Sequence, residues 1–537
     1  MTWQWIRASV FGTEGRRFES VRVYQFKGYM KPLNALGQQF ADALTNAAAQ
    51  NNFATTNKQH AQKVHVTGAG RTLTFAYEQL RNAAEYADDH LLQYAIKRFY
   101  KRIFLSRDGV VVKDSGEELI VELTLAGYLQ NDSIPTTIVN RINELAADYF
   151  AVHAKYTKEE WTLGVLAVEI EQLLNVDLKR EVFAQFAYDY FLQTINRRRF
   201  GQPIANFEIV LFVAVHRALL KSDPATIRTI LLRRYQQKTD TITYKQTNEM
   251  IDSILVSSAT DKVYRLVNRQ SAPFRVLWRL IDDHENAAQL IGSRQQFLST
   301  YDKQIEKEYS QINKRINKGV LKSVIFLVIT KVLIGVSIEV PYDYATRGSI
   351  LLLPLAINLL FPPIYMIFLR FTLQLPGSTN ARALTNAIDN LLYGDEHAVT
   401  LSRQASKGFG LTFNVAYVIF SILIFGGVAL WLMTFGFGLL HLLIFFMFLS
   451  AASFLGFRLS RQIRELEVVE GQQSGITMLR DFFYIPFVIV GQWISDKYAR
   501  VNIVALVLDM VIELPLKTSL HLIRQWGMFI SNKKDEI

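Results

Sequence analysis

The chain of 537 residues contains no cysteine. Disulfide bonds, thiolate metal sites, cysteine nucleophiles and cysteine-ligated iron–sulfur clusters are therefore excluded. The absence is consistent with a reducing compartment. We also expect no secretory signal, because the N-terminal segment lacks an apolar core of about 7–15 residues.

Enzyme motifs are lacking as well. The segment Gly68-Ala-Gly70-Arg71 has neither the third glycine of a dinucleotide site nor the lysine of a phosphate loop. His284-Glu285 lacks the second histidine that a zinc peptidase carries four residues after the first. No Gly-x-Ser-x-Gly elbow occurs, and the nine histidines are scattered. We therefore predict no catalytic residue, cofactor or metal site, and we favour a protein that is not an enzyme.

Charge is missing from three long runs in the C-terminal part of the chain. Residues 349–369, 411–435 and 439–457 contain 21, 25 and 19 positions without Asp, Glu, Lys or Arg. A helix needs about 20 apolar residues to cross a bilayer core of about 30 Å. Nearly all the long uncharged runs lie after residue 320, and most of the preceding sequence reads as helix. The sequence predicts a mainly α fold, with a cytoplasmic helical domain followed by a polytopic helical membrane domain.

The predicted organisation has four parts. Residues 1–292 form the cytoplasmic domain, 293–319 a stalk helix, 320–457 four transmembrane helices, and 458–537 a basic connector with an amphipathic or re-entrant membrane-associated tail. Within the domain we expect a polar linker at 51–63 and two small hairpins, one at 64–75 and one pairing 110–112 with 119–125. The stalk carries an apolar seam with helical spacing that either packs on its own domain, transmits movement or self-associates: Phe297, Tyr301, Ile305, Ile312 and Ile316.

The loops between the predicted spans differ in charge. The first span covers residues 320–338, and the short turn at 339–348 carries two acids and one base. Basic residues mark the alternate loops: Arg382, Arg403, Lys407, Arg458, Arg461 and Arg464. Because basic residues are retained on the cytoplasmic side, we expect the domain, the 372–410 loop and the C-terminus to be cytoplasmic. The expected location is the plasma membrane, with several passes.

The tail has two interpretations. Residues 482–494 are apolar but number only 13, and residues 501–530 are apolar with one narrow polar stripe. A helix of the second kind lies in the membrane interface with its polar stripe in water, and this is the interpretation we favour. In the alternative, both segments cross the membrane and turn Asp509 and Glu513 towards the bundle.

Lys331 is the sharpest candidate for a functional residue. A lysine near the centre of a bilayer costs about 2.5–3.5 kcal/mol on insertion scales, so it requires a partner or a water-filled cavity. Its candidate partners are Glu339, Asp509 and Glu513. In the alternative, the helix is shifted or tilted, and Lys331 reaches the membrane interface.

The second span also contains a polar side chain, Asn358, among Pro354, Pro362 and Pro363. Transporters use proline-broken helices to coordinate ions at membrane depth, although membrane helices also tolerate proline as a simple kink. We favour the kink. Asn358 nevertheless completes a candidate intramembrane polar site with Lys331, Glu339, Asp509 and Glu513.

Basic clusters with neighbouring aromatic residues are candidates for contact with lipid headgroups. In the alternative they are helix ends, where cations stabilise the helix dipole. The net charge is +11, from 59 Lys and Arg against 48 Asp and Glu, and we do not expect a nucleic-acid partner. The candidate residues are Lys97, Arg98, Lys101, Arg102, Arg197, Arg198, Arg199, Arg233 and Arg234.

Two classes of function follow from these patterns. The first is an integral membrane scaffold or interaction protein whose domain binds the lipid bilayer or a cytoplasmic protein. The alternative is a channel or secondary transporter with a polar pathway around Lys331. A lipid-modifying membrane enzyme ranks third, because no interfacial polar cluster is evident. Self-association into a homo-oligomer stays open.

Overall fold

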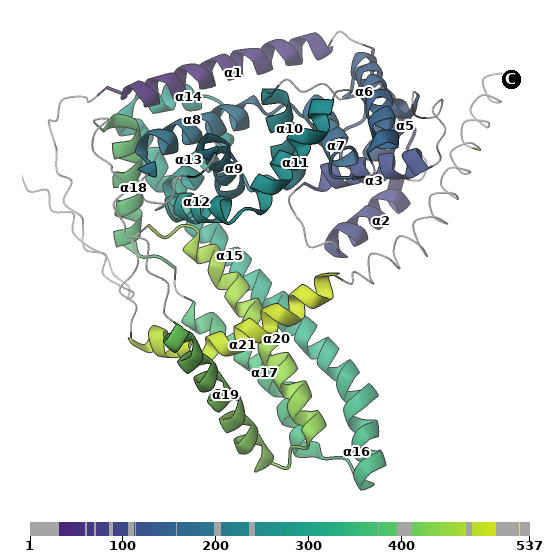
Figure 1. The fold of residues 1–537 in the computed structure, drawn as a ribbon, viewed down its shortest axis with the longest axis vertical. Coiled ribbons are helices and arrows are strands. Elements are labelled where there is room, and N and C mark those ends of the chain that lie inside the picture. Colours follow the sequence, from purple (N-terminus) through teal and green to yellow (C-terminus); the bar gives the residue numbers. More distant parts are fainter. Residues whose placement is uncertain are drawn as a thin grey trace, which may run out of the picture.

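A computed structural model describes residues 32–59, 62–68, 71–84, 90–105, 112, 114–156, 158–197, 204, 206–235, 242–373, 375–394, 411–468, 475–500 and 526. The regular structure in these ranges is helical, with one isolated β-bridge between Lys63 and Pro135. The predicted helical fold is confirmed in the described residues, because a helical domain precedes four apolar helices. The cytoplasmic placement of the domain stays a prediction. Figure 1 shows the domain at one end and the apolar helices projecting from it as a bundle.

The domain is an assembly of short helices around an aromatic-rich core. Ring pairs such as Phe183 with Phe274 and Phe191 with Phe274 link helices distant in sequence. The helices are α1 (Ala35–Gln59), α2 (Arg71–Ala84), α3 (Leu91–Leu105), α5 (Ser115–Leu125), α6 (Thr136–Lys155), α7 (Leu163–Leu174), α8 (Leu178–Thr194), α9 (Phe207–Leu219), α10 (Pro224–Arg234), α11 (Ile242–Val256), α12 (Ser258–Arg269), α13 (Ala272–Asp283) and α14 (Ala287–Gly292).

Both predicted hairpins and the predicted linker are wrong where the structure describes them. Helix α2 begins at Arg71, α5 covers Ser115–Leu125, and α1 continues to Gln59. In α5 the buried residues Leu119, Ile120 and Leu123 recur with helical rather than alternating spacing. Gly116, which lies between the two segments of the predicted hairpin, is in the first turn of this helix, and its N–H donates to Asn143 Oδ1 at 2.7 Å.

The bundle begins with a continuous helical stretch of 54 residues, Arg294–Arg347. It consists of α15 (Arg294–Ile334), a π-helical turn η2 (Gly335–Glu339) and α16 (Val340–Arg347). The remaining helices are α17 (Leu352–Thr372), α18 (Ser378–Tyr393), α19 (Leu411–Met433), α20 (Leu439–Arg464) and α21 (Gly475–Arg500). In the part of the chain that the structure describes, four segments are long and apolar enough to cross a membrane: Arg294–Arg347, Leu352–Thr372, Val415–Met433 and Leu439–Arg464.

The predicted turn at residues 339–348 is wrong, because the first span stays helical as far as Arg347. Proline inside an α-helix lacks an N–H and clashes with the carbonyl four residues earlier. Here Pro341 follows the π-helical turn, in which the Val340 N–H donates to the Gly335 oxygen five residues back. The wider turn lets the helix continue, and Gly348 ends it with a left-handed φ of 69°.

The stalk seam packs on its own chain. Phe297, Tyr301, Ile305, Ile312 and Ile316 are all buried, and α15 contacts α13, α14 and α18 of the domain end. The Tyr301 hydroxyl donates to the Pro273 oxygen at 3.0 Å. The seam is therefore covered within one chain.

Polar contacts also hold the base of the bundle to the domain. Arg275 donates to the Glu465 backbone oxygen just after α20, at 2.8 Å. Asn380 of α18 donates to the Leu466 oxygen at 2.8 Å, and Arg370 of α17 reaches Asn313 on α15 at 2.6 Å. These contacts fix the domain end of the bundle, whereas residues 348–351 and 436–438 form its opposite end, here named the far end (Figure 1).

The tail begins with a helix longer than the apolar segment predicted at residues 482–494. Helix α21 covers Gly475–Arg500 and crosses α20 (Figure 1), where a Cβ on Gly491 would lie 2.1 Å from the Ser450 oxygen. It is not among the four candidate spans found in the described part of the chain. The predicted residues Asp509 and Glu513 lie outside the described residues, so both interpretations of the tail stay predictions.

Candidate intramembrane polar site

Five polar side chains meet inside the bundle between the first, second and fourth candidate spans. Lys331, Glu339 and Asp343 come from the continuous first helix, Asn358 from α17 and His441 from α20. Each is at most 1 % exposed. We refer to these five residues as the polar site.

The π-helical turn brings the three residues of the first span onto one face. In an uninterrupted α-helix, residues eight apart lie about 80° apart around the axis. The wider turn at Gly335–Glu339 changes this phase and directs Glu339 towards Lys331. Asp343 follows Glu339 by four residues, which keeps it on the same face.

Lys331 and Glu339 form the centre of the polar site. Lys331 Nζ donates to Glu339 Oε1 at 2.5 Å and lies 4.8 Å from the centroid of the Phe448 ring. A carboxylate and an aromatic ring face are groups that commonly contact ammonium ions in proteins. The ammonium thus lies inside the bundle beside one of its three predicted partners.

Asn358 connects this ion pair to α20. Its Nδ2 lies 3.5 Å from both carboxylate oxygens of Glu339 and donates to the His441 backbone oxygen at 3.3 Å. Helix α17 runs unbroken through Pro362 and Pro363, so it is not a broken helix at these positions.

Asp343 and His441 form a second pair nearer the far end. His441 Nε2 lies 3.3 Å from Asp343 Oδ1, although the two groups are not oriented for a hydrogen bond. The other carboxylate oxygen of Asp343 accepts from the Leu351 N–H at 3.1 Å. The rings of Tyr342 and Phe437 flank the imidazole at 6.4 and 6.1 Å between centroids.

The polar site has more hydrogen-bonding capacity than the described protein groups use. Within the described residues, Asp343 Oδ1, Asn358 Oδ1 and both ring nitrogens of His441 are buried without a hydrogen-bond partner. Such a group costs about 1–3 kcal/mol and calls for an explanation, of which a functional role is one.

Further polar groups continue from the site towards the domain. The hydroxyls of Tyr365 on α17 and Ser453 on α20 lie 3.0 Å apart, and Ser450 is fully buried. Tyr365 follows Asn358 by seven residues on the same helix face, about 10 Å along the axis. The interior contact between α17 and α20 therefore carries a row of polar groups.

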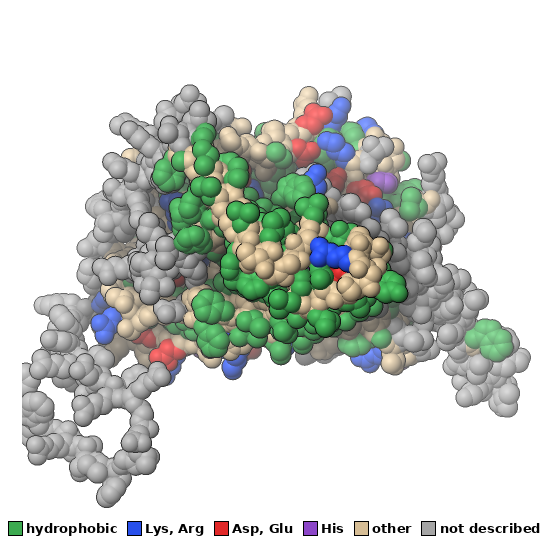
Figure 2. All heavy atoms as spheres, turned by 90° about the horizontal axis from the view of Figure 1, so that it is seen from below, with side chains coloured by type: hydrophobic (Ala, Val, Ile, Leu, Met, Phe, Trp, Pro, Cys, Tyr) green, Lys and Arg blue, Asp and Glu red, His purple; other side chains and the backbone are tan. Residues whose placement is uncertain are grey.

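The outer surface of the bundle, at its far end and on its flanks, is largely apolar. Figure 2 looks onto the far end, where hydrophobic side chains surround a small group of basic and acidic atoms. Large apolar side chains on the flanks are exposed, including Leu333, Ile364 and Leu423 at 61 %, 58 % and 66 %. An apolar outside around a polar inside is typical of a helical membrane protein.

The sequence prediction omits Asp343 and His441. Asp343 falls in residues 339–348, which the sequence predicts to form a short turn between two spans. His441 is a lone histidine in an otherwise uncharged run, where no spacing rule singles it out. One sequence signal could have identified Asp343. It follows Glu339 by four residues, so the two side chains share one face if the helix continues through both positions.

The basic clusters of the domain make contacts within the domain itself. Arg98 pairs with Glu78 and Arg102 with Glu122, at 2.9 and 2.7 Å. The other described members contact nearby groups: Lys97 and Lys101 with Glu159, Arg197 with Glu208, Arg233 with Glu181 and Gln172, and Arg234 with the rings of Tyr188 and Phe212. Arg198 and Arg199 lie outside the described residues. Binding of lipid headgroups stays a prediction.

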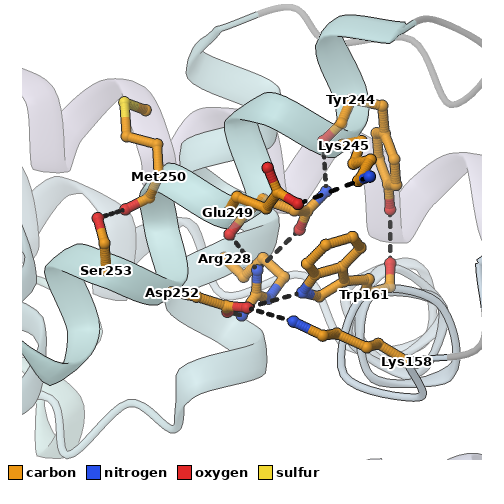
Figure 3. Close-up of polar contacts among 10 residues, drawn as sticks. Lys158, Trp161, Arg228, Tyr244, Lys245, Glu249, Met250, Asp252 and Ser253 are labelled. Atoms are coloured by element: carbon orange, nitrogen blue, oxygen red, sulfur yellow. Dashed lines mark hydrogen bonds and ion pairs between the residues drawn. The ribbon is translucent and has the colours of Figure 1, made fainter.

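The domain also contains a buried arginine, Arg228, which joins α10 to α11 (Figure 3). It donates to Asn248 Oδ1 at 2.7 Å and to Asp252, which also accepts from the Trp161 ring N–H at 3.1 Å. Burial alone would raise the pKa of Asp252, but the hydrogen bond and charge of Arg228, with Trp161 and Lys158, lower it overall. These contacts join α10 and α11 to Trp161, and we assign the network a structural role.

Comparison with protein-family models, with curated proteins and with solved structures gives no match. Four helices of membrane-spanning length and composition, with a helical domain at one end, indicate a helical membrane protein. The polar site inside its apolar bundle is therefore the starting point for function.

Proposed function

We propose that the protein is a transport protein that moves an ion across the cell membrane through the bundle of α15–α17 and α20. The observation that carries the proposal is the complete burial of Lys331, Glu339, Asp343, Asn358 and His441 in one connected cluster. The helical domain is cytoplasmic in this proposal, and the far end faces outward.

The free-energy cost of burying charged groups in a membrane favours transport over anchoring as the reason for the cluster. Each ionised residue near the bilayer centre costs about 2.5–3.5 kcal/mol on insertion scales. A buried ion pair such as Lys331 with Glu339 is often no more stable than packed apolar residues of similar size. A protein that only anchors a domain gains nothing from this arrangement, whereas an ion needs polar groups inside the membrane.

The test is current measurement on proteoliposomes adsorbed to a solid-supported membrane, with stepwise gradients of H⁺, Na⁺ and K⁺. The informative variant combines Lys331→Met with Glu339→Gln, which removes both charges and leaves neither unpaired. We expect it to lose the current. Lys322→Met, an exposed lysine of the same helix, is the matched control and should keep it. Intact currents in the double variant, or no current in the unmodified protein, would contradict the proposal.

A second candidate is the membrane-anchored scaffold predicted from the sequence. A specific observation favours it: one helical stretch of 54 residues runs from the domain to the far end, and Arg275 and Asn380 hold the domain to α20. A scaffold should keep its partner when the polar site is neutralised. Crosslinking the full chain in its native membrane, with and without the double substitution, separates the two functions.

A further inference from the structure

The polar site contains two acid–base pairs at different depths. Asp343 lies four residues before the end of α16, about 6 Å along the helix, and Lys331 lies a further 18 Å inward. The outer pair is Asp343 with His441, and the inner pair is Glu339 with Lys331. Resting on the proposed transport function, we propose that the transported ion is the proton, that the outer pair loads it, and that the inner pair opens when Glu339 receives it.

The inner pair favours a proton over a metal cation. The Lys331 ammonium lies 2.5 Å from the Glu339 carboxylate, in the position where a metal cation would have to bind. A metal cation would be repelled by this ammonium and would need several further oxygen ligands. A proton needs neither, since it bonds to one carboxylate oxygen and neutralises the group on which the ion pair depends.

The outer pair has the groups that proton loading requires. The facing nitrogen of His441 and oxygen of Asp343 are 3.3 Å apart, buried and without other hydrogen-bond partners in the described structure. A small reorientation of either side chain lets a proton pass between them. When it does, the O–H bond on Asp343 breaks and an N–H bond forms on His441, so an imidazolium faces a carboxylate.

The charged and titratable groups near the outer pair belong mainly to the first helix. The first helix contributes Glu339, Lys331, Tyr342 and the exposed Arg347, whose guanidinium lies beside Gly438 near the His441 ring. Helix α17 contributes only the neutral Asn358, which bridges the Glu339 carboxylate and the His441 backbone. The Asn358 amide thus contacts the inner pair and the backbone, rather than the ring, of the outer residue His441.

Proton arrival at Glu339 changes the inner pair. The His441 imidazolium first turns from Asp343 towards Glu339. One N–H bond then breaks on the imidazolium, one O–H bond forms on the carboxylate, and one unit of positive charge moves inward. The neutral acid no longer holds the Lys331 ammonium by charge. The released lysine side chain then turns along the interior row of Tyr365 and Ser453, towards the domain end, where one ammonium N–H bond breaks and the proton leaves to water. The neutral amine returns and takes the proton from Glu339, which restores the ion pair.

The experiment uses proteoliposomes of the full chain that contain the pH dye pyranine, with a potential set by potassium and valinomycin. We expect interior acidification, and a loss of its rate of about 100-fold in Asp343→Asn and in His441→Gln, a size typical of a removed acid–base group. Asp302→Asn changes an exposed carboxylate on the same helix and serves as the control. Asp343→Glu, which keeps the acid, should retain flux and so shows that loss reflects chemistry rather than misfolding.

The outcomes separate this inference from the proposed function. Sodium or potassium current without a change of interior pH would overturn the proton assignment and leave transport standing. No current for any of the three ions would overturn both. Full proton flux in Asp343→Asn and His441→Gln, in protein that elutes as a single species, would remove the outer pair from the route. A pH dependence of flux that His441→Gln leaves unchanged would also contradict its role.

Discussion

At the scale of single residues, the sequence identified part of the polar site. A charged residue in an apolar run stands out, so Lys331 could be predicted, and Glu339 was near enough to be named as its partner. Asn358 was found because it is polar within an uncharged span. His441 and Asp343 could not be found in this way, because their positions depend on how α20 packs and on whether the helix continues past Pro341.

Removing one charge from the inner pair should be costly, whereas removing both should not. Glu339→Gln leaves the Lys331 ammonium buried without a counter-ion, and we expect it to lower the free energy of unfolding by about 3–5 kcal/mol. Lys331→Met together with Glu339→Gln should recover most of this loss. Thermal unfolding in detergent, followed by intrinsic fluorescence, measures both. Equal stability of the single and double variants would show that the two charges are not coupled.

Asp252 provides a residue-scale prediction in the domain. Because its pKa is lowered in the folded state, its stabilising contribution is present above its unfolded pKa of about 3.9 and disappears as the pH falls through the folded value. We expect Asp252→Asn to have a lower melting temperature than the unmodified protein between about pH 5 and 7, and this difference should disappear as the pH falls below the unfolded pKa and through the folded one. Asp282→Asn, an exposed carboxylate on α13, is the control. If the difference in melting temperature persists at low pH, the ionisation of Asp252 is not its cause.

At the scale of elements, long apolar helices were predicted well and short segments poorly. A span of about 20 uncharged residues has few alternative structures. A short segment such as Ser115–Leu125 is decided by its neighbours: it is a helix because its apolar residues pack against α3 and α6. The π-helical turn was equally hidden, since it depends on Pro341 and on the pairing of Lys331 with Glu339.

The crossing of α20 and α21 depends on one glycine. A Cβ on Gly491 would lie 2.1 Å from the Ser450 backbone oxygen, so Gly491→Ala must separate the two helices. We expect a loss of about 1–3 kcal/mol, the usual cost of overpacking, and easier proteolysis of α21. Gly426→Ala on α19 is the matched control, because a Cβ there meets nothing within 4 Å. If both substitutions leave limited proteolysis unchanged, the close approach of α20 and α21 is wrong.

At the scale of the whole molecule, the loop charges and the fold point to the same arrangement. Residues 348–351 and 436–438 close the far end, and the basic end of α20 lies near the domain, where Arg275 donates to the Glu465 backbone oxygen. The domain, α18 and the end of α20 therefore share one side of the bundle, which is the side that the basic loops predict to be cytoplasmic. The proposed direction of proton loading depends on this orientation.

The absence of native cysteine makes the orientation directly measurable. Ser349→Cys introduces one thiol in the exposed loop at the far end, and Ser258→Cys introduces one at the exposed start of α12 in the domain. We expect a membrane-impermeant maleimide to label the first in intact cells and the second only after permeabilisation. The pattern follows because the far end faces outward when the basic loops are retained inside. Reversed labelling would show that the bundle has the opposite orientation in the membrane. Asp343 and His441 would then receive protons from the cytoplasm.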